Sequence, residues 1–138
     1  MSFTGQCLCG SVKYECSAEP VFSGKCHCND CQKASGSAFS AVIAVPESTI
    51  SIQGEVKFFE SIGGSGKKTR RGFCPVCGSM LFGKPESLPG LIVVHAGSLD
   101  DTSKFHPQMD IFVSRAAPWD FIHPSANSFP EMPPNPNA

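Results

Sequence analysis

The sequence has no long apolar run, no excess charge of either sign, and only one Trp and one Tyr among its 138 residues. No stretch approaches the roughly 20 apolar residues that a helix needs to span a bilayer, so no membrane partner is expected. The formal net charge of −1 provides no general attraction to nucleic acid, and none is expected as a partner. With 41% hydrophobic and 17% charged residues, the composition is that of an ordinary globular protein of one domain.

The N-terminus also lacks the pattern of a secretory signal. Residues 1–6 contain no basic region followed by an apolar run, which predicts a cytoplasmic protein. In that reducing compartment structural disulfides are rare, and clustered cysteines more often bind metal or react. Cysteines separated by a single residue would also make strained disulfide partners. The cysteine clusters therefore favour metal binding over a disulfide framework.

Seven of the eight cysteines fall into three clusters that have the spacings of metal ligands. They are the pair Cys7 and Cys9, the triplet Cys26, Cys28 and Cys31, and the pair Cys74 and Cys77. The two pairs can supply the four thiolates of a closed tetrahedral zinc site, whereas the triplet leaves one corner open. A closed site stabilises a fold, and an open one can do chemistry. The sequence therefore predicts two Zn²⁺ sites of different kinds.

Local sequence supports the closed site. Residues two apart on a strand point to the same face, so Cys7 and Cys9 can present both sulfurs to one ion. The segment Cys74-Pro-Val-Cys77 followed by Gly78 is typical of a zinc knuckle, because the glycine allows a sharp turn with positive φ. Such an ion would tie the start of the chain to its middle and contribute to folding.

The triplet leaves three interpretations open. In the first, a substrate thiol or water takes the fourth corner of the zinc site. In the second, the site is also structural and is completed by His27, His95, His106 or Cys16. In the third, the thiols are redox-active and form a transient disulfide. Cys16 stands apart from the clusters and is interpreted as a small buried hydrophobe.

The remaining pattern predicts a mainly β protein with zinc knuckles in its turns. Expected strands cover residues 11–16, 39–45, 55–60, 91–96 and 110–113, and one short helix covers 29–34. The glycine-rich segment 63–68 is expected to be a hairpin tip. Trp119 and Phe121 are expected to anchor in the core. The chain divides into a zinc-binding domain over 1–123 and a proline-rich tail over 124–138, which wraps over the surface or is partly disordered.

Four segments together resemble a known family. They are residues 6–12 (QCLCGSV), 26–33 (CHCNDCQK), 71–79 (RGFCPVCGS) and 97–101 (GSLDD). In this order they resemble the glutathione-dependent formaldehyde-activating enzyme family, whose domain is shared with centromere protein V, over about residues 3–123. The resemblance implies a β-tent fold related to methionine sulfoxide reductase B. It also implies a structural zinc on Cys7, Cys9, Cys74 and Cys77, and a catalytic zinc on Cys26, Cys28 and Cys31.

The activity that this resemblance implies is that of a carbon–sulfur lyase. Family members add glutathione to formaldehyde and give S-hydroxymethylglutathione. The expected partners are therefore glutathione or another small thiol, and formaldehyde or another small aldehyde. The competing class is a non-catalytic, zinc-stabilised binding module, as the relation to centromere protein V allows. The sequence does not name a general acid or an oligomeric state.

Two further features bear on the substrate. Many members of the family carry histidine where this chain has Asp110, so a substrate role at that position would change preference or rate. Lys67, Lys68, Arg70 and Arg71 form the single basic cluster. It is interpreted as a solvated loop or, alternatively, as a group that captures the carboxylates of glutathione.

Overall fold

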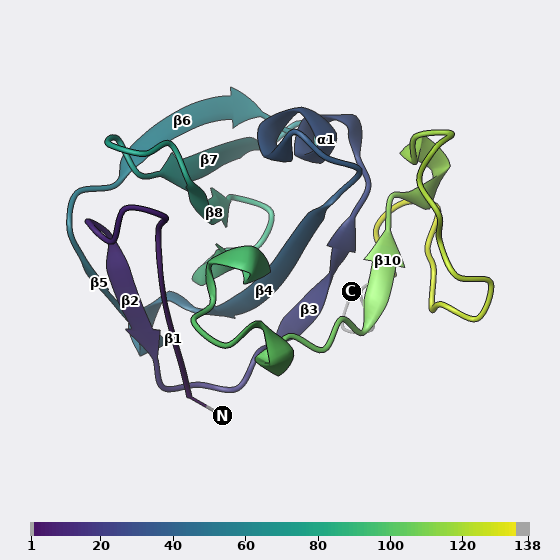
Figure 1. Cartoon of the computed structure of the whole chain (residues 1–138). Coiled ribbons are helices and arrows are strands. Elements are labelled where there is room, and N and C mark those ends of the chain that lie inside the picture. The colour runs from purple at the N-terminus through teal and green to yellow at the C-terminus, as the bar shows by residue number, and fades with distance from the viewer. Residues whose placement is uncertain (1, 135–138) are drawn as a thin grey trace.

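The computed structural model describes residues 2–134, which form two β-sheets joined by short helices (Figure 1). The smaller sheet is antiparallel, and its order β1-β2-β5 places β2 (Lys13–Cys16) between β1 (Phe3–Gln6) and β5 (Ile50–Gln53). The larger sheet has seven strands in the order β10-β3-β4-β9-β8-β7-β6. These strands are β3 (Phe22–Cys26), β4 (Ser40–Pro46), β6 (Lys57–Ile62), β7 (Lys68–Phe73), β8 (Met80–Pro85), β9 (Leu91–His95) and β10 (Met109–Ile111). All neighbours in it are antiparallel except β10 and β3.

The helices are short. The longest described is α1 (Asn29–Ser35), which ends at Gly36 in the left-handed conformation with φ 67°. The others are 3-10 turns: η1 (Glu47–Thr49), η2 (Ala96–Ser98), η3 (Thr102–Lys104) and η4 (Val113–Arg115). Across residues 2–134, none of the helices combines the length and the apolar character that crossing a bilayer requires.

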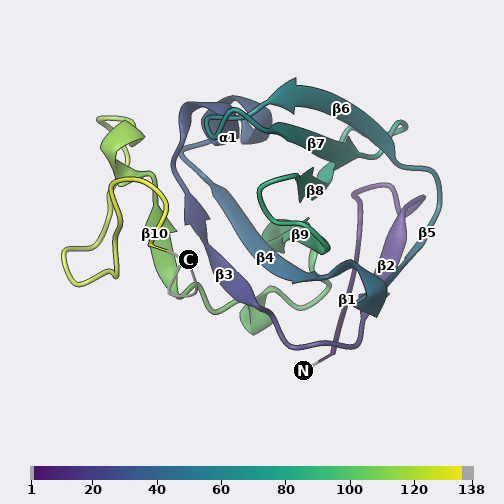
Figure 2. The same ribbon diagram turned by 180° about the vertical axis from the view of Figure 1, so that it is seen from behind.

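The two sheets enclose one hydrophobic core. In Figures 1 and 2 the strands curl around a common interior, with the smaller sheet on one side and β3 and β4 on the other. Alternate side chains of β1 and β2 are buried, as expected for strands with one face on a core. The residues buried most completely include Val12, Ile43, Val45, Leu81, Phe82, Ile92 and Val94. Both sheets therefore depend on the same apolar interior.

Tyr14 links the two sheets through this core. Its ring packs edge-on against Phe3 and Phe82, with centroid separations of 6.4 and 5.4 Å. Its hydroxyl lies 2.6 Å from the Ser98 hydroxyl, which satisfies the polar end of a buried aromatic side chain. Gly5 on the neighbouring strand makes room for the ring, because a Cβ atom there would overlap the Tyr14 oxygen.

The predicted elements are confirmed in kind, with boundaries shifted by a few residues. The mainly β class holds, and the expected strands correspond to β2, β4, β6, β9 and β10, and the expected helix to α1. The glycine-rich segment joins β6 to β7 as a hairpin. The pattern implied β7 only as the second strand of this hairpin, and it missed β1, β3, β5 and β8. The relation to methionine sulfoxide reductase B stays a prediction.

The described part of the proline-rich tail wraps over β10. The Asp110 N–H donates to the Asn127 carbonyl at 3.0 Å, and the Phe129 N–H donates to the Asp110 carbonyl at 2.9 Å. The Ser114 hydroxyl donates to the Pro130 carbonyl at 2.7 Å. These bonds confirm that the tail follows the surface, while residues 135–138 lie outside the described residues. The division at residue 123 stays a prediction.

The packing at Gly5 generates a test of the core. Gly5→Ala should lower the free energy of unfolding by about 1–3 kcal/mol, because the added methyl displaces Tyr14 from a well-packed site. Gly97→Ala is the matched control, since a Cβ atom there meets nothing within 4 Å and should change stability by less than about 0.5 kcal/mol. Urea denaturation of both variants measures the difference. Equal stability would contradict the assigned packing.

Candidate metal centres

Two loops bring four cysteines together at one end of the core. Cys7 and Cys9 follow β1, and Cys74 and Cys77 follow β7. All four sulfurs lie within 4.8 Å of one another, with Cys7 to Cys9 at 3.7 Å and Cys9 to Cys74 at 3.8 Å. Zinc–sulfur bonds of about 2.3 Å in a tetrahedron place the sulfurs about 3.8 Å apart. The four-thiol arrangement therefore fits a zinc ion.

Backbone N–H groups and hydroxyls surround these sulfurs. The Val12 N–H donates to Cys7 Sγ at 3.3 Å, and the Cys77 N–H donates to Cys74 Sγ at 3.4 Å. Gly78 has φ 77°, which confirms the predicted sharp turn, and its N–H donates to the Cys74 carbonyl at 2.8 Å. The Ser11 hydroxyl lies 3.0 Å from Cys9 Sγ. Such donors stabilise sulfur ligands in the charged form.

These contacts act on the pKa values of the thiols. Burial by itself raises the pKa of Cys7, but hydrogen bonds from the Val12 N–H and the Ser11 hydroxyl outweigh it and bring the pKa to about 7. The Ser79 hydroxyl and N–H lower the pKa of Cys77 to about 5. Cys7 and Cys77 can thus ionise near neutral pH, and the thiolate is the form that binds a metal.

The second group of sulfurs lies at the junction of β3 and α1. Cys26 ends β3, Cys28 is the N-cap of α1, and Cys31 lies in its first turn. Their sulfurs lie within 4.8 Å of one another, and the Cys31 N–H donates to Cys28 Sγ at 3.3 Å. The neighbouring thiols lower the pKa of Cys28, and the same contacts raise the pKa of Cys26. Three thiols arranged in this way fit three corners of a zinc site.

Among the described residues, no further Cys, His, Asp or Glu joins this triplet as a fourth ligand. Cys16 is buried in the core and lies 3.5 Å from the Thr49 hydroxyl. Neither His95 nor His106 belongs to a group of metal-binding side chains. Within residues 2–134 the triplet therefore groups three thiols where the other site groups four, and its open corner stays a prediction.

His27, between the first two cysteines of the triplet, is held by two carboxylates. It is 1% exposed, with Nε2 2.7 Å from Asp110 Oδ1 and Nδ1 2.6 Å from Asp120 Oδ2. Lys25 Nζ lies 3.8 Å from Asp110, so this carboxylate has a second polar partner beside His27. With both nitrogens engaged, His27 is not the missing ligand. We call this cluster of His27, Asp110 and Asp120 the histidine clamp.

The segment that carries Asp120 contradicts the prediction that Trp119 and Phe121 lie in the core. Trp119 and Phe121 are 72% and 77% exposed, so the prediction that they anchor in the core is wrong. These two residues flank Asp120, whose side chain reaches His27 and whose N–H donates to the Ala117 carbonyl at 3.0 Å to close a turn. No sequence signal pointed to Asp120, because its partner lies 93 positions away.

Comparison with known proteins assigns the family. The sequence pattern described as glutathione-dependent formaldehyde-activating enzyme matches residues 2–115. The chain belongs to this family. A Penicillium rubens relative provisionally named as such an enzyme is 32% identical over 121 residues, which cover 82% of this chain and 63% of the relative. A Talaromyces marneffei relative with the same provisional name is 32% identical over 113 residues, covering 78% and 60%. The chain thus spans about three fifths of the length of these curated relatives.

A solved structure supports the fold. The crystal structure of a Rhodobacter sphaeroides protein superimposes with a TM-score of 0.55 and 22% identity, covering 70% of this chain and 87% of the other. At this identity the likeness concerns the fold alone.

The position at which many family members carry histidine has an internal role in this chain. Asp110 is 5% exposed and bonds His27, so its carboxylate is engaged inside the protein. In this chain the Asp110 carboxylate therefore supports His27, which lies between the first two cysteines of the triplet.

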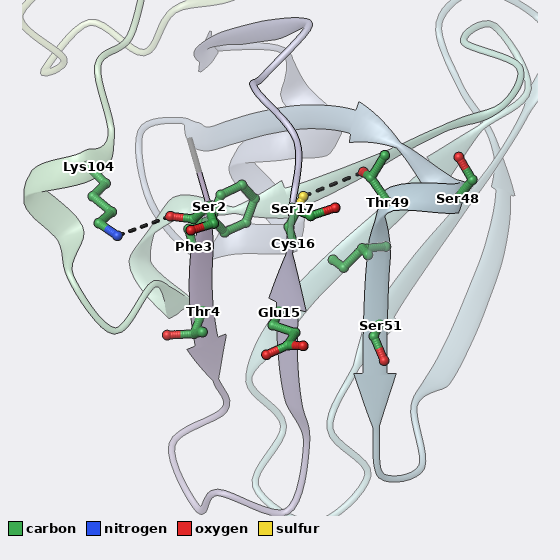
Figure 3. A pocket seen from close by; sticks show the side chains of 11 residues that line it. Ser2, Phe3, Thr4, Glu15, Cys16, Ser17, Ser48, Thr49, Ser51 and Lys104 are labelled. Atoms are coloured by element: carbon green, nitrogen blue, oxygen red, sulfur yellow. Dashed lines mark hydrogen bonds between the residues drawn. The ribbon is translucent and has the colours of Figure 1, made fainter.

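A pocket of about 460 Å³ opens elsewhere, at one end of the smaller sheet (Figure 3). Hydroxyl groups of Ser and Thr residues line much of it, and Lys104 at its edge donates to the Ser2 carbonyl at 3.1 Å. None of the seven clustered cysteines lines this pocket. It is therefore separate from both candidate metal centres.

The histidine clamp can be tested through stability. Asp120→Ala should lower the free energy of unfolding by about 1–3 kcal/mol, because it leaves the buried Nδ1 of His27 without its hydrogen-bond partner while Nε2 keeps Asp110. Asp101→Ala is the control, since this carboxylate is exposed and caps only η3, and its loss should destabilise the protein less than loss of Asp120. Denaturant unfolding of both variants provides the comparison. Similar losses for the two would show that the clamp contributes little.

Proposed function

We propose that the protein is a zinc-dependent carbon–sulfur lyase that adds a thiol such as glutathione to formaldehyde or another small aldehyde. The observation that carries the proposal is the difference between the two thiol groups, one with four ligands and one with three. Family membership and the names of the relatives support glutathione and formaldehyde as the substrates.

The proposed reaction joins the thiol sulfur to the carbonyl carbon. The S–H proton passes to the carbonyl oxygen as the carbon–oxygen π bond breaks, so thiol and aldehyde give an S-hydroxymethyl thioether with no other reactant. A zinc ion at the triplet would supply Lewis acidity that favours ionisation of the incoming thiol. Cys26, Cys28 and Cys31 would hold this ion, and Cys7, Cys9, Cys74 and Cys77 would hold a structural one.

The chain's own residues prepare the triplet for this role. The Cys31 N–H holds the Cys28 sulfur, and Gln32 Nε2 donates to the His27 carbonyl at 2.8 Å. The His27 N–H donates to the Ile111 carbonyl at 3.0 Å. These bonds fix the backbone between the first two thiols. Preorganisation of this kind keeps a binding site in its productive geometry.

Unequal roles for the two sites lead to a test by substitution. Cys77→Ser should remove a structural ligand and prevent folding, because metal binding at such a site is part of the folding free energy. Cys28→Ser should leave the fold intact and lower zinc content by about one ion per chain. Metal analysis and thermal melts of both variants decide the matter. Equal loss of stability would indicate that both sites are structural.

Direct entry of a thiol can be followed in cobalt-substituted protein. Titration with glutathione should change the cobalt–thiolate absorption, because a soft sulfur ligand suits the open corner of the triplet. S-methylglutathione, which has no free thiol, should leave the spectrum unchanged. A spectrum that no small thiol alters would exclude the lyase proposal and favour a non-catalytic binding module. A response to thiols without consumption of formaldehyde would indicate a different aldehyde.

A further inference from the structure

Two adjacent arginines of β7 project to opposite faces of the larger sheet. The Arg70 guanidinium lies 4.6 Å from the centre of the Phe58 ring. This cation–π contact holds Arg70 against the ring. Arg71 is half-buried, and its Nη1 donates to the Ser61 hydroxyl at 3.3 Å. Since neighbouring residues of a strand alternate in direction, Arg71 lies on the face away from Phe58.

The register of the sheet places His95 on the same face as Arg71. Arg71 pairs with Gly83 of β8, and Gly83 pairs with Val93 of β9. His95 is two residues after Val93 and so projects in the same direction. Gly83 contributes no side chain between them, and the Val93 side chain lies against it on this face.

The same face continues to the triplet. His95 pairs with Val42 of β4, and Val42 pairs with Gly24 of β3. Cys26 is two residues after Gly24 and belongs to the same face. The helix α1, which carries Cys31, follows Cys26 directly and contacts β4 of the same sheet. One curved face therefore joins Arg71 to the triplet by way of His95.

The charge on this face is not neutralised. Within residues 2–134, no carboxylate forms an ion pair with Arg71. Burial and the nearby Arg71 charge lower the pKa of His95 to about 4, so the imidazole is neutral at pH 7 and Arg71 is the cation there. A half-buried guanidinium without an anionic partner is a favourable site for a carboxylate, which it can bind with two parallel hydrogen bonds.

We propose that Arg71 is a specificity-determining residue that binds a carboxylate of the thiol substrate, with His95 on the same face of the sheet as a second hydrogen-bonding group. This inference rests on the proposed function and names the substrate class, which is a thiol that bears a carboxylate at a distance from its sulfur. A tripeptide such as glutathione extends about 10 Å and carries two carboxylates. A small uncharged thiol would reach the triplet without gaining this contact.

Cobalt-substituted protein allows thiol entry to be measured for several ligands and variants. Arg71→Gln should weaken binding of glutathione by about tenfold or more, as for loss of a hydrogen bond to a charged group. Binding of 2-mercaptoethanol should stay unchanged. Arg70→Gln is the matched control, since it removes the same charge from the opposite face, and should alter neither affinity. Arg71→Lys should recover part of the glutathione affinity because it restores the charge without the planar fork.

A measurement on the unmodified chain makes the test independent of variant folding. Glutathione diethyl ester, in which both carboxylates are blocked, should bind about tenfold more weakly than glutathione. Equal binding of the acid and the ester, or equal effects of Arg70→Gln and Arg71→Gln, would overturn the role of Arg71 while leaving the proposed function standing. A spectrum that responds to no thiol at all would overturn both.

Discussion

The contact between two thiol pairs that are far apart in sequence is the constraint on which the rest of the structure depends. Cys7 and Cys9 follow the first strand of the smaller sheet, whereas Cys74 and Cys77 follow β7 of the larger one. Their sulfurs meet within 4.8 Å, so the loops of two different sheets converge at one point. Four thiols this close, held by N–H donors, form a stable arrangement when a metal ion balances their charge.

The triplet uses the same ligand type, a cysteine thiol, as the four-thiol site, but it groups three thiols and not four. It lies where β3 passes into α1, and its fourth corner has no ligand among residues 2–134. The histidine clamp stiffens this junction by placing a buried imidazole between two carboxylates. Because Asp120 belongs to the segment after β10, the C-terminal part of the chain supports the site without contributing a ligand. Buried charges tolerate such a position only when they are paired.

One face of the larger sheet carries Cys26, His95 and Arg71. Two positions on this face are glycines. Gly83 pairs with Val93, and Gly24 pairs with Val42. Arg70 and Arg71 are neighbours in sequence, yet one packs on Phe58 and the other has no anionic partner in the described chain. The alternation of a strand separates their roles. The basic cluster is therefore not uniform, and only Arg71 lies on the face of the triplet.

The sequence by itself determined the thiol groups, the mainly β class, the hairpin between β6 and β7, and the helix after the triplet. These features are local, since C-x-C, C-x-x-C and strand alternation fix geometry within a few residues. Only the tertiary structure decided the partners of His27, which lie 83 and 93 positions away, and the exposure of Trp119. It also decided which arginine faces the triplet. A local pattern reports the conformation of its own segment, whereas pairing between distant segments follows from how the sheets pack around a shared core.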